Sequence, residues 1–309
     1  MRFAFTDDQL AFRDAVRDLL AKECPAAAVR AAWIGDTTGA ERAWDALRAM
    51  GALGVLVPEA AGGLGLTELD LVLLLEESGR AALPAPFVEH AAVAAPLVGE
   101  DVRVLTASLG PDPLVPYATR ADAILVEDDE RLLLISRPAV LTEPRPSVDH
   151  ARDLAAVDWD SSVGAVTELG GAEAVALAFD RGALGTAAVL LGLAQHLLDA
   201  TVEYVCERRQ FGAPIGSFQA LKHKLADVRV ALEFARPLVY RAAASLAASD
   251  PEAAVHVSMA KARASDTASL AARHALQCHG AIGYSYEYDL HLFMKRAWAL
   301  ARSWGDARV

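Results

Sequence analysis

Residues 207–228, ERRQFGAPIGSFQALKHKLADV, hold the side chains best suited to binding a phosphorylated ligand. The basic residues of this segment are Arg208, Arg209, Lys222, His223 and Lys224. An arginine fork fits a phosphate bidentately, and an aromatic ring can cover a flat base. Arg208 and Phe211 could therefore hold the pyrophosphate and the ring of a nucleotide. The same residues also suit an ordinary helix C-terminus, where basic side chains and a glycine are favoured.

A second candidate segment, residues 277–284, reads QCHGAIGY. Gly280 and Gly283 would let the backbone approach a ligand closely, and the Gln277 amide can bond a ribose or phosphate oxygen. A G-x-x-G between helices is also a common turn. The glycine-rich loop 62–65 resembles a phosphate cradle, but Glu68 and Asp70 open the helix behind it and would repel an anion. We interpret that loop as a structural turn.

Other catalytic chemistries find little support. His274 and His279 are five residues apart, which does not align two metal ligands on one helical face as a spacing of four would. No G-x-S-x-G elbow supports a serine nucleophile.

The bulk composition excludes several classes of partner. The chain has 309 residues and a net charge of −12, which argues against nucleic acid because duplex binding relies on Lys and Arg. Cys24, Cys206 and Cys278 are far apart and form no CxxC, so we expect reduced thiols in a cytoplasmic protein. The N-terminus does not resemble a signal peptide, and the apolar stretches are too short to predict a membrane span.

The predicted elements fall into three parts, a helical domain over 1–100, a β domain over 101–180 and a helical bundle over 181–309. In the first, TDDQ at Thr6–Gln9 matches a capping box, a helix covers about 40–50, and Thr67 caps a helix that ends at Gly79. In the second, five to seven short strands alternate with Pro- and Asp-rich turns. The strands are expected in VRVLTAS, ADAILVED, RLLLISR, AVDWDS and AVALAF.

The last part predicts four long helices joined by short connections, which is typical of a four-helix bundle. The expected helices cover 183–206, 218–249 with a kink at Pro237, about 252–277, and 289–304. The fold class is therefore mostly α with a small β domain.

Taken together, the chain resembles the acyl-CoA dehydrogenase family over nearly its whole length. The order of the three domains matches, and PEAAGGLGL is similar to a loop of the family's N-terminal domain. ERRQFGAPIGSFQALKHKLADV and ALQCHGAIGYSYEYDLHLFMKRA are similar to its two most recognisable segments.

The resemblance implies FAD as cofactor, bound across a subunit interface, with the flavin ring on one subunit and the adenosine and pyrophosphate on the neighbour's bundle. By motif match, the residues that would hold the neighbour's FAD are Arg208, Gln210, Phe211, Gln277, Gly280 and Ala281. We call these six the clamp residues. The implied substrate is an acyl-CoA or related thioester.

The family removes an α-proton with a glutamate, and this chain departs from both usual positions of that base. The position after the last long helix holds Trp304, and the alternative position at the start of the bundle holds Gly182. The nearest carboxylates are Asp180 and Asp306. The flavin-ring loops depart as well, because the early region lacks the family's T-E-P stretch. Thr142-Glu143-Pro144 and Trp159 come too late in the order of strands to serve.

These features lead to three hypotheses. In the first, the chain is the partner subunit that completes the FAD site in a heteromeric, heterotetrameric acyl-CoA dehydrogenase of fatty acid or steroid catabolism. In the second, it is a self-sufficient, homo-oligomeric dehydrogenase of acyl-CoA or acyl-carrier thioesters, with its base relocated to Asp180 or Asp306. In the third, it is a flavin-free scaffold of the same fold.

Overall fold

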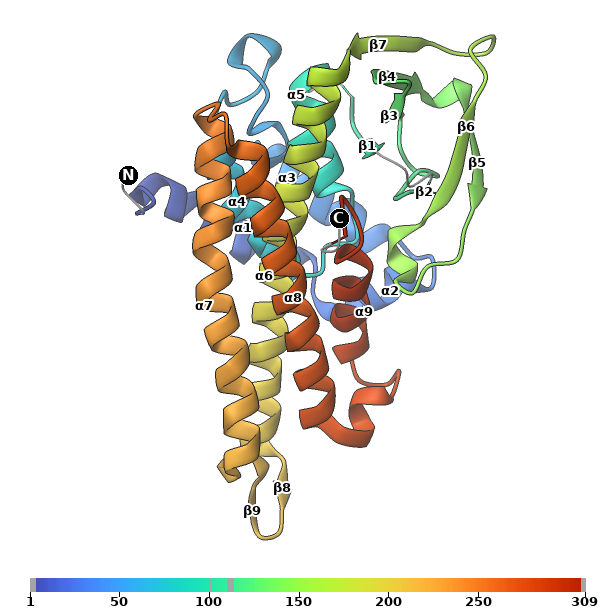
Figure 1. Cartoon of the computed structure of the whole chain (residues 1–309). Coiled ribbons are helices and arrows are strands. Elements are labelled where there is room, and N and C mark those ends of the chain that lie inside the picture. Colours follow the sequence, from blue (N-terminus) through green and yellow to red (C-terminus); the bar gives the residue numbers. More distant parts are fainter. Residues whose placement is uncertain (1–3, 100–101, 110–113, 307–309) are drawn as a thin grey trace.

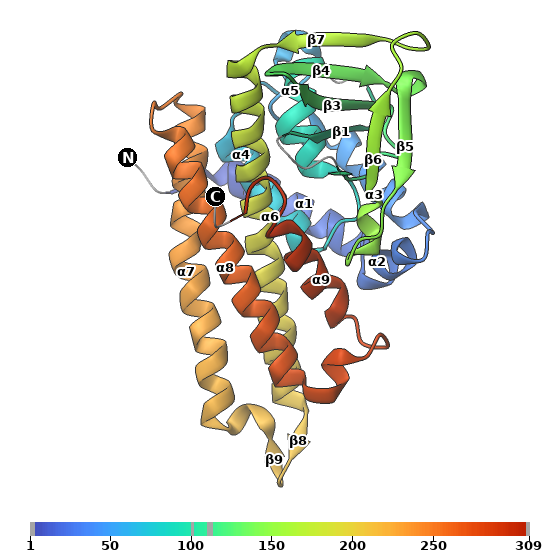
Figure 2. The same ribbon diagram turned by 45° about the vertical axis from the view of Figure 1, so that its right-hand side comes forward.

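A computed structural model describes residues 4–99, 102–109 and 114–306 of the chain. N-terminal helices and a small β domain lie against one side of a long helical bundle, and the bundle extends well beyond them at its lower end (Figure 1). Figure 2 shows the β domain beside the upper half of the bundle only. The lower tip of the bundle is therefore free of the β domain (Figure 2).

The N-terminal part consists of helices, two of which begin at capping boxes. The helices are α1 (Asp7–Glu23), α2 (Ala26–Trp33), α3 (Thr38–Ala49), α4 (Glu68–Arg80), a π-helical segment η3 (Val88–Ala94) and α5 (Ala95–Val98). The capping boxes of Thr6 with Gln9 and of Thr67 with Asp70 are both present. Helix α2 and the π-helical segment escaped the sequence analysis, because alanine-rich and uniformly apolar runs show little periodicity.

The β domain contains two small sheets. A four-stranded sheet has the order β1-β3-β4-β7, and a three-stranded sheet has the order β2-β6-β5. The strands are β1 (Leu105–Ser108), β2 (Leu114–Val115), β3 (Ala123–Asp128), β4 (Arg131–Ser136), β5 (Val140–Pro144), β6 (Ala155–Trp159) and β7 (Val166–Gly170). β1 and β3 run parallel, whereas the other pairs are antiparallel.

The bundle is built from four helices. They are α6 (Ala172–Glu207), α7 (Gln219–Ala247), α8 (Ala253–His279) and α9 (Leu290–Leu300). Two expectations were wrong. Residues 174–179, expected as a strand, belong to α6, because a six-residue apolar run fits either structure and its alanines favour the helix. The last helix ends at Leu300 rather than at Trp304.

Small residues allow the helices to approach closely. A Cβ built on Gly192 of α6 would lie 1.9 Å from the backbone oxygen of Glu76, and one built on Gly79 of α4 would lie 2.1 Å from that of Val189. A row of buried alanines at helical spacing gives α8 the same property. By length and composition α6 could cross a membrane, but 67% of its most apolar window is buried in the protein, as expected of a central core helix.

His90 joins the π-helical segment to the β domain, because its Nδ1 accepts a 3.0 Å hydrogen bond from the backbone N–H of Leu105. Burial lowers the pKa of His90 from 6.5 to about 3. Between pH 6.5 and about 3, His90 is therefore protonated in the unfolded chain but neutral in the folded one. The free energy of unfolding accordingly decreases as the pH falls below 6.5.

We expect the free energy of unfolding to fall by up to ~1.4 kcal/mol per pH unit below 6.5 on account of this residue. Denaturant unfolding at pH 7.5 and 5.0 measures the effect. His90→Asn keeps an acceptor but does not titrate near neutral pH, so its decline should be shallower. An equal decline in wild type and variant would contradict the assignment.

Candidate functional site

A short hairpin at the lower end of the bundle presents the first group of clamp residues. Helix α6 ends at Glu207, and Arg208 leaves it in extended conformation. β8 (Arg209–Gln210) then pairs antiparallel with β9 (Ala213–Pro214). Phe211 and Gly212 form the turn with φ values of +52° and +80°, as a tight two-residue hairpin requires. This turn leaves the Phe211 side chain 92% exposed.

The end of α8 presents the second group of clamp residues. Helix α8 ends at His279, and Gly280 turns the chain away with a φ of +63°. The His279 ring stacks on the Tyr204 ring of α6 at 4.2 Å between centroids, and the Tyr204 hydroxyl donates a 3.4 Å hydrogen bond to the His279 carbonyl. The structure thus brings both motifs to one end of the bundle (Figures 1 and 2).

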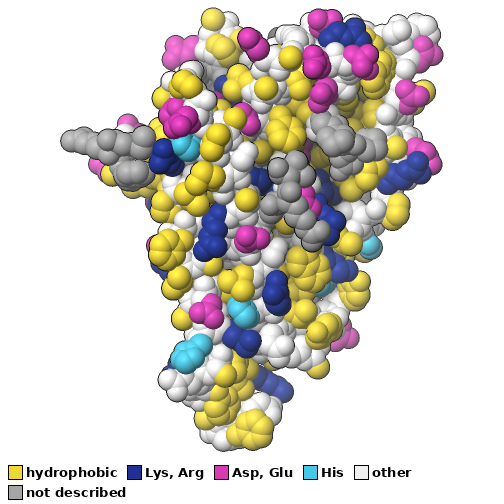
Figure 3. Space-filling model, in the orientation of Figure 1, with side chains coloured by type: hydrophobic (Ala, Val, Ile, Leu, Met, Phe, Trp, Pro, Cys, Tyr) yellow, Lys and Arg dark blue, Asp and Glu magenta, His cyan; other side chains and the backbone are white. Residues whose placement is uncertain are grey.

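All six clamp residues are exposed. Among the described residues, Arg208, Lys222 and Lys224 form no ion pair, whereas many other arginines are paired with carboxylates. Figure 3 shows basic and histidine side chains above an apolar tip at this lower end. An unpaired guanidinium group and an amide, together with an exposed aromatic ring, are the groups that a dinucleotide needs. The residues therefore fit the adenosine and pyrophosphate of FAD.

The two usual positions of the family's base lie against each other. A Cβ built on Gly182 would be only 2.3 Å from Cε3 of Trp304, so the indole ring covers the glycine directly. Trp304 sits in the turn after α9 with a φ of +55°. The buried Lys261 holds this turn, because its Nζ donates to the carbonyls of Ala301 at 3.1 Å and Gly305 at 2.9 Å. An indole ring thus occupies the position at which the resemblance leads us to expect a carboxylate.

The two fallback carboxylates, Asp180 and Asp306, lie two residues from Gly182 and from Trp304 in the sequence. Asp180 precedes Gly182 by two residues on α6, and side chains two apart on a helix point in different directions. Partial burial raises the pKa of Asp180. Asp306 follows Trp304 and lies near Lys261, where its charge raises the lysine pKa against the dominant effect of burial.

Glu89 is a buried carboxylate in this region that the sequence did not single out. It is 5% exposed. Burial raises the pKa of Glu89, while Arg152, a backbone hydrogen bond, the Trp304 side chain and Arg296 oppose that rise. Glu89 lines a cavity of about 30 Å³ together with both arginines, which is room for water rather than an acyl chain. A lone acid within the apolar run FVEHAAVA was the signal available in the sequence.

Beside this cavity, Arg296 of the bundle forms hydrogen bonds to the β domain and to the N-terminal part. It lies on α9 of the bundle and is 4% exposed. Its Nε donates to the fully buried Asp149 of the β domain, and its Nη1 donates a 2.8 Å hydrogen bond to the Leu83 carbonyl of the N-terminal part. Arg296 is therefore paired with Asp149 beside the cavity that Glu89 lines.

The TEP stretch and Trp159, which the sequence places too late for the flavin-ring loops, lie outside the four-stranded sheet that begins with β1. Thr142, Glu143 and Pro144 lie in β5, where Glu143 pairs with Arg145 at the surface. Trp159 ends β6 opposite Val140. Both strands belong to the three-stranded sheet. Part of the early stretch that lacks T-E-P, residues 110–113, lies outside the described residues.

Comparison with known proteins identifies the two helical parts of the chain. The family model "Acyl-CoA dehydrogenase, N-terminal domain" matches residues 6–100, and "Acyl-CoA dehydrogenase, C-terminal domain" matches residues 170–308. Acyl-CoA dehydrogenase IpdE2 of Mycolicibacterium smegmatis is 33% identical over 98% of this chain and 96% of its own length. IpdE2 of Mycobacterium tuberculosis is 33% identical over 94% of this chain and 91% of its own length.

Solved structures agree with this result. The structure of the Tcur3481-Tcur3483 steroid acyl-CoA dehydrogenase superposes with a TM-score of 0.84 and 26% identity, covering 98% of this chain and 95% of that one. The ChsE4-ChsE5 complex from Mycobacterium tuberculosis shares the fold with a TM-score of 0.89, covering 100% and 96% of the two chains at 23% identity. This chain therefore belongs to the acyl-CoA dehydrogenase family, whose members are FAD-dependent oxidoreductases.

Proposed function

We propose that this chain is the partner subunit of a heteromeric acyl-CoA dehydrogenase that α,β-desaturates an acyl-CoA thioester from fatty acid or steroid breakdown. It contributes the clamp residues to the FAD site, and a second acyl-CoA dehydrogenase subunit contributes the flavin-ring pocket and the base. The proposal depends on the packing of Trp304 on Gly182. An indole and a glycine provide no proton acceptor at either of the two usual positions of the base.

The relatives support this proposal. Two of the similar solved structures are named for pairs of gene products, one as a steroid acyl-CoA dehydrogenase and one as a complex. In addition, the clamp residues are exposed and lie at the end of the bundle remote from the chain's own β domain (Figure 2). A cofactor held there is available to a neighbouring subunit.

In the proposed mechanism this chain binds and orients rather than transfers protons. Arg208 would pair with the pyrophosphate, Phe211 would cover the adenine ring, and Gln277 with the Gly280–Ala281 backbone would bond the ribose and phosphate oxygens. When bound, FAD supplies the hydride acceptor. Trp304 and the Glu89–Arg152–Arg296 cluster fill this chain's own counterpart of the acyl cavity and so exclude substrate from it.

Co-production with a full-length acyl-CoA dehydrogenase subunit encoded beside it tests the proposal. We expect a complex of both subunits, a flavin absorbance spectrum and acyl-CoA-dependent reduction of an electron acceptor. The chain alone should bind FAD poorly and show no turnover. Rapid dehydrogenation by the chain alone with stoichiometric FAD would overturn the proposal.

One observation favours the self-sufficient alternative, namely that partial burial raises the pKa of Asp180 toward the range useful for a base. We expect Asp180→Asn and Asp306→Asn each to leave the activity of the assembled enzyme within twofold of wild type. Both variants should be assayed for turnover and for α-proton exchange with FAD content as the control. A loss of exchange at unchanged FAD content would assign the base to this chain.

A protein that is colourless both alone and when co-produced with the second subunit would favour a scaffold role.

A further inference from the structure

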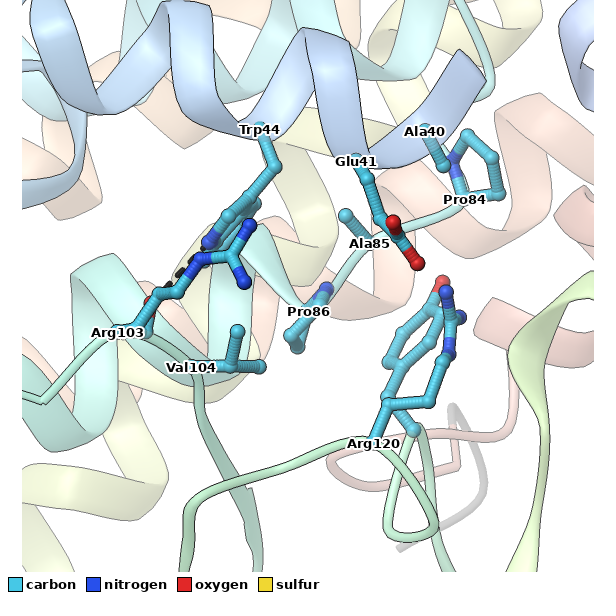
Figure 4. Close-up of a pocket in the computed structure, with 10 residues that line it drawn as sticks. Ala40, Glu41, Trp44, Pro84, Ala85, Pro86, Arg103, Val104 and Arg120 are labelled. Carbon is cyan, nitrogen blue, oxygen red and sulfur yellow. Dashed lines mark hydrogen bonds between the residues drawn. The ribbon is translucent and has the colours of Figure 1, made fainter. Parts of the chain in front are cut away.

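A second cavity lies between the N-terminal helices and the start of the β domain, well away from the clamp residues. Its volume is about 270 Å³. Figure 4 shows Glu41 and Trp44 entering it from α3, Arg103 and Val104 from the segment that leads into β1, and Arg120 from the opposite loop. With Pro84–Pro86, four separate segments thus surround one space.

The walls of this cavity are flat and apolar. Trp44, Pro84, Pro86 and Val104 form most of them. The indole N–H of Trp44 is already used, because it donates a 3.1 Å hydrogen bond to the Arg103 carbonyl. Trp44 therefore contributes only its apolar ring. Such a lining accommodates a ring or a short branched chain by burial of apolar surface.

Arg120 is a charged group of this lining whose side chain donates no hydrogen bond among the described residues. Its side chain is 28% exposed and its buried Nε has no hydrogen-bond partner. Its nearest carboxylate oxygen, Oδ2 of Asp153, is 3.7 Å from Nε, and its guanidinium lies 5.4 Å from the centre of the Tyr117 ring. Arg103 on the same cavity differs, since its Nη2 bonds both Asp45 oxygens at 3.0 and 3.1 Å.

The backbone around Arg120 is held in an uncommon conformation. Tyr117 also lines the cavity, is 4% exposed and has a φ of +58°. A buried tyrosine in the left-handed region is costly and persists only where the surroundings fix it. The backbone N–H of Tyr117 donates to the Arg152 carbonyl at 2.8 Å. The loop that presents Arg120 is thereby fixed before any ligand arrives.

The surrounding charges limit what this cavity can accept. Glu41 lines the cavity, while Asp45 and Asp153 stand behind the two arginines. These acids would repel a polyanion such as the phosphates of CoA, whereas a single carboxylate can be met by Arg120. The volume lies just below the range usual for drug-sized ligands, so the ligand is small.

We propose that this cavity binds a small monocarboxylate with an apolar ring or short branched body, its carboxylate on Arg120 and its body against Trp44 and the two prolines. The proposal is independent of the partner-subunit role. A free acid, rather than its CoA thioester, is the class of molecule selected.

The test uses the purified protein together with any subunit that assembles with it, and cyclohexanecarboxylate as probe. We expect saturable binding in calorimetry or ligand-observed NMR, and much weaker binding of the neutral isostere cyclohexanemethanol. Arg120→Gln should raise the Kd of the acid about tenfold or more, as loss of a charged hydrogen bond does. Glu41→Gln should lower that Kd, because it removes the competing carboxylate.

Arg131→Gln is the matched control, since Arg131 pairs with Asp128 at the surface of the β domain. It should leave the Kd unchanged. Glu41→Gln keeps the test decisive if Arg120→Gln folds poorly, because it retains Arg120. Absence of saturable binding to the wild type, equal affinity for acid and alcohol, or no response to either cavity variant would overturn the proposal.

Discussion

Replacing Arg208 with alanine is expected to lower the affinity of the assembled enzyme for FAD by about 10- to 100-fold. A hydrogen bond to a charged group contributes about 1.5–3 kcal/mol, and Arg208 is exposed without an ion-pair partner among the described residues. Its removal therefore takes away a phosphate contact without breaking a contact that supports the fold. Flavin absorbance after gel filtration and equilibrium titration of the apoprotein with FAD measure the loss.

Arg229→Ala is a suitable control for that experiment. Arg229 is also an exposed arginine of the bundle, but it pairs with Glu233 one turn along α7. It should lower the FAD affinity by less than twofold and the stability by less than ~1 kcal/mol. Unchanged FAD content in Arg208→Ala at limiting cofactor would show that the hairpin is only a helix terminus.

Replacing Arg296 with methionine is expected to lower the free energy of unfolding by about 3–5 kcal/mol, the usual cost of breaking a buried ion pair from one side. The substitution leaves the Asp149 carboxylate fully buried without its arginine. It also removes the donor to the Leu83 carbonyl. Urea unfolding followed by circular dichroism measures the change.

The double variant Arg296→Met with Asp149→Leu separates the charge from the packing. Replacing both members of a buried pair by apolar residues is often close to neutral, so the double variant should be more stable than Arg296→Met alone. Arg131→Met, at an exposed pair, should cost less than ~1 kcal/mol. If the double variant is as unstable as the single one, the tie to Leu83 rather than the charge pair dominates.

The elements that the sequence predicts well are those with strong local signals. Thr6 and Thr67 begin helices because each has an acceptor side chain followed by a residue that completes a capping box. Gly51 ends the segment after α3 with a φ of +79°. The strand expected over residues 174–179 was wrong because six consecutive apolar residues show neither helical nor strand periodicity. Packing in the bundle decides that these residues belong to α6.

Some residues of the candidate site can likewise be singled out from the sequence, whereas others cannot. Arg208, Phe211, Gln277 and Gly280 stand out by residue type, so the sequence alone proposes them as binding residues, and this role stays a prediction. The contact between Gly182 and Trp304, and the cluster of Glu89 with Arg152 and Arg296, bring together residues from distant segments. Only the tertiary structure places such residues together, and no local pattern encodes their distance.

The contact of Trp304 with Gly182 also constrains how the sequence can change. Any side chain introduced at residue 182 collides with the indole ring, which lies 2.3 Å from the position of the first added carbon. A glutamate at 182 would thus be tolerated only after Trp304 had already become smaller, and that earlier step opens an empty space in a packed interior. An acid at residue 182 therefore requires two coordinated substitutions. Strong epistasis between the two positions follows from their geometry.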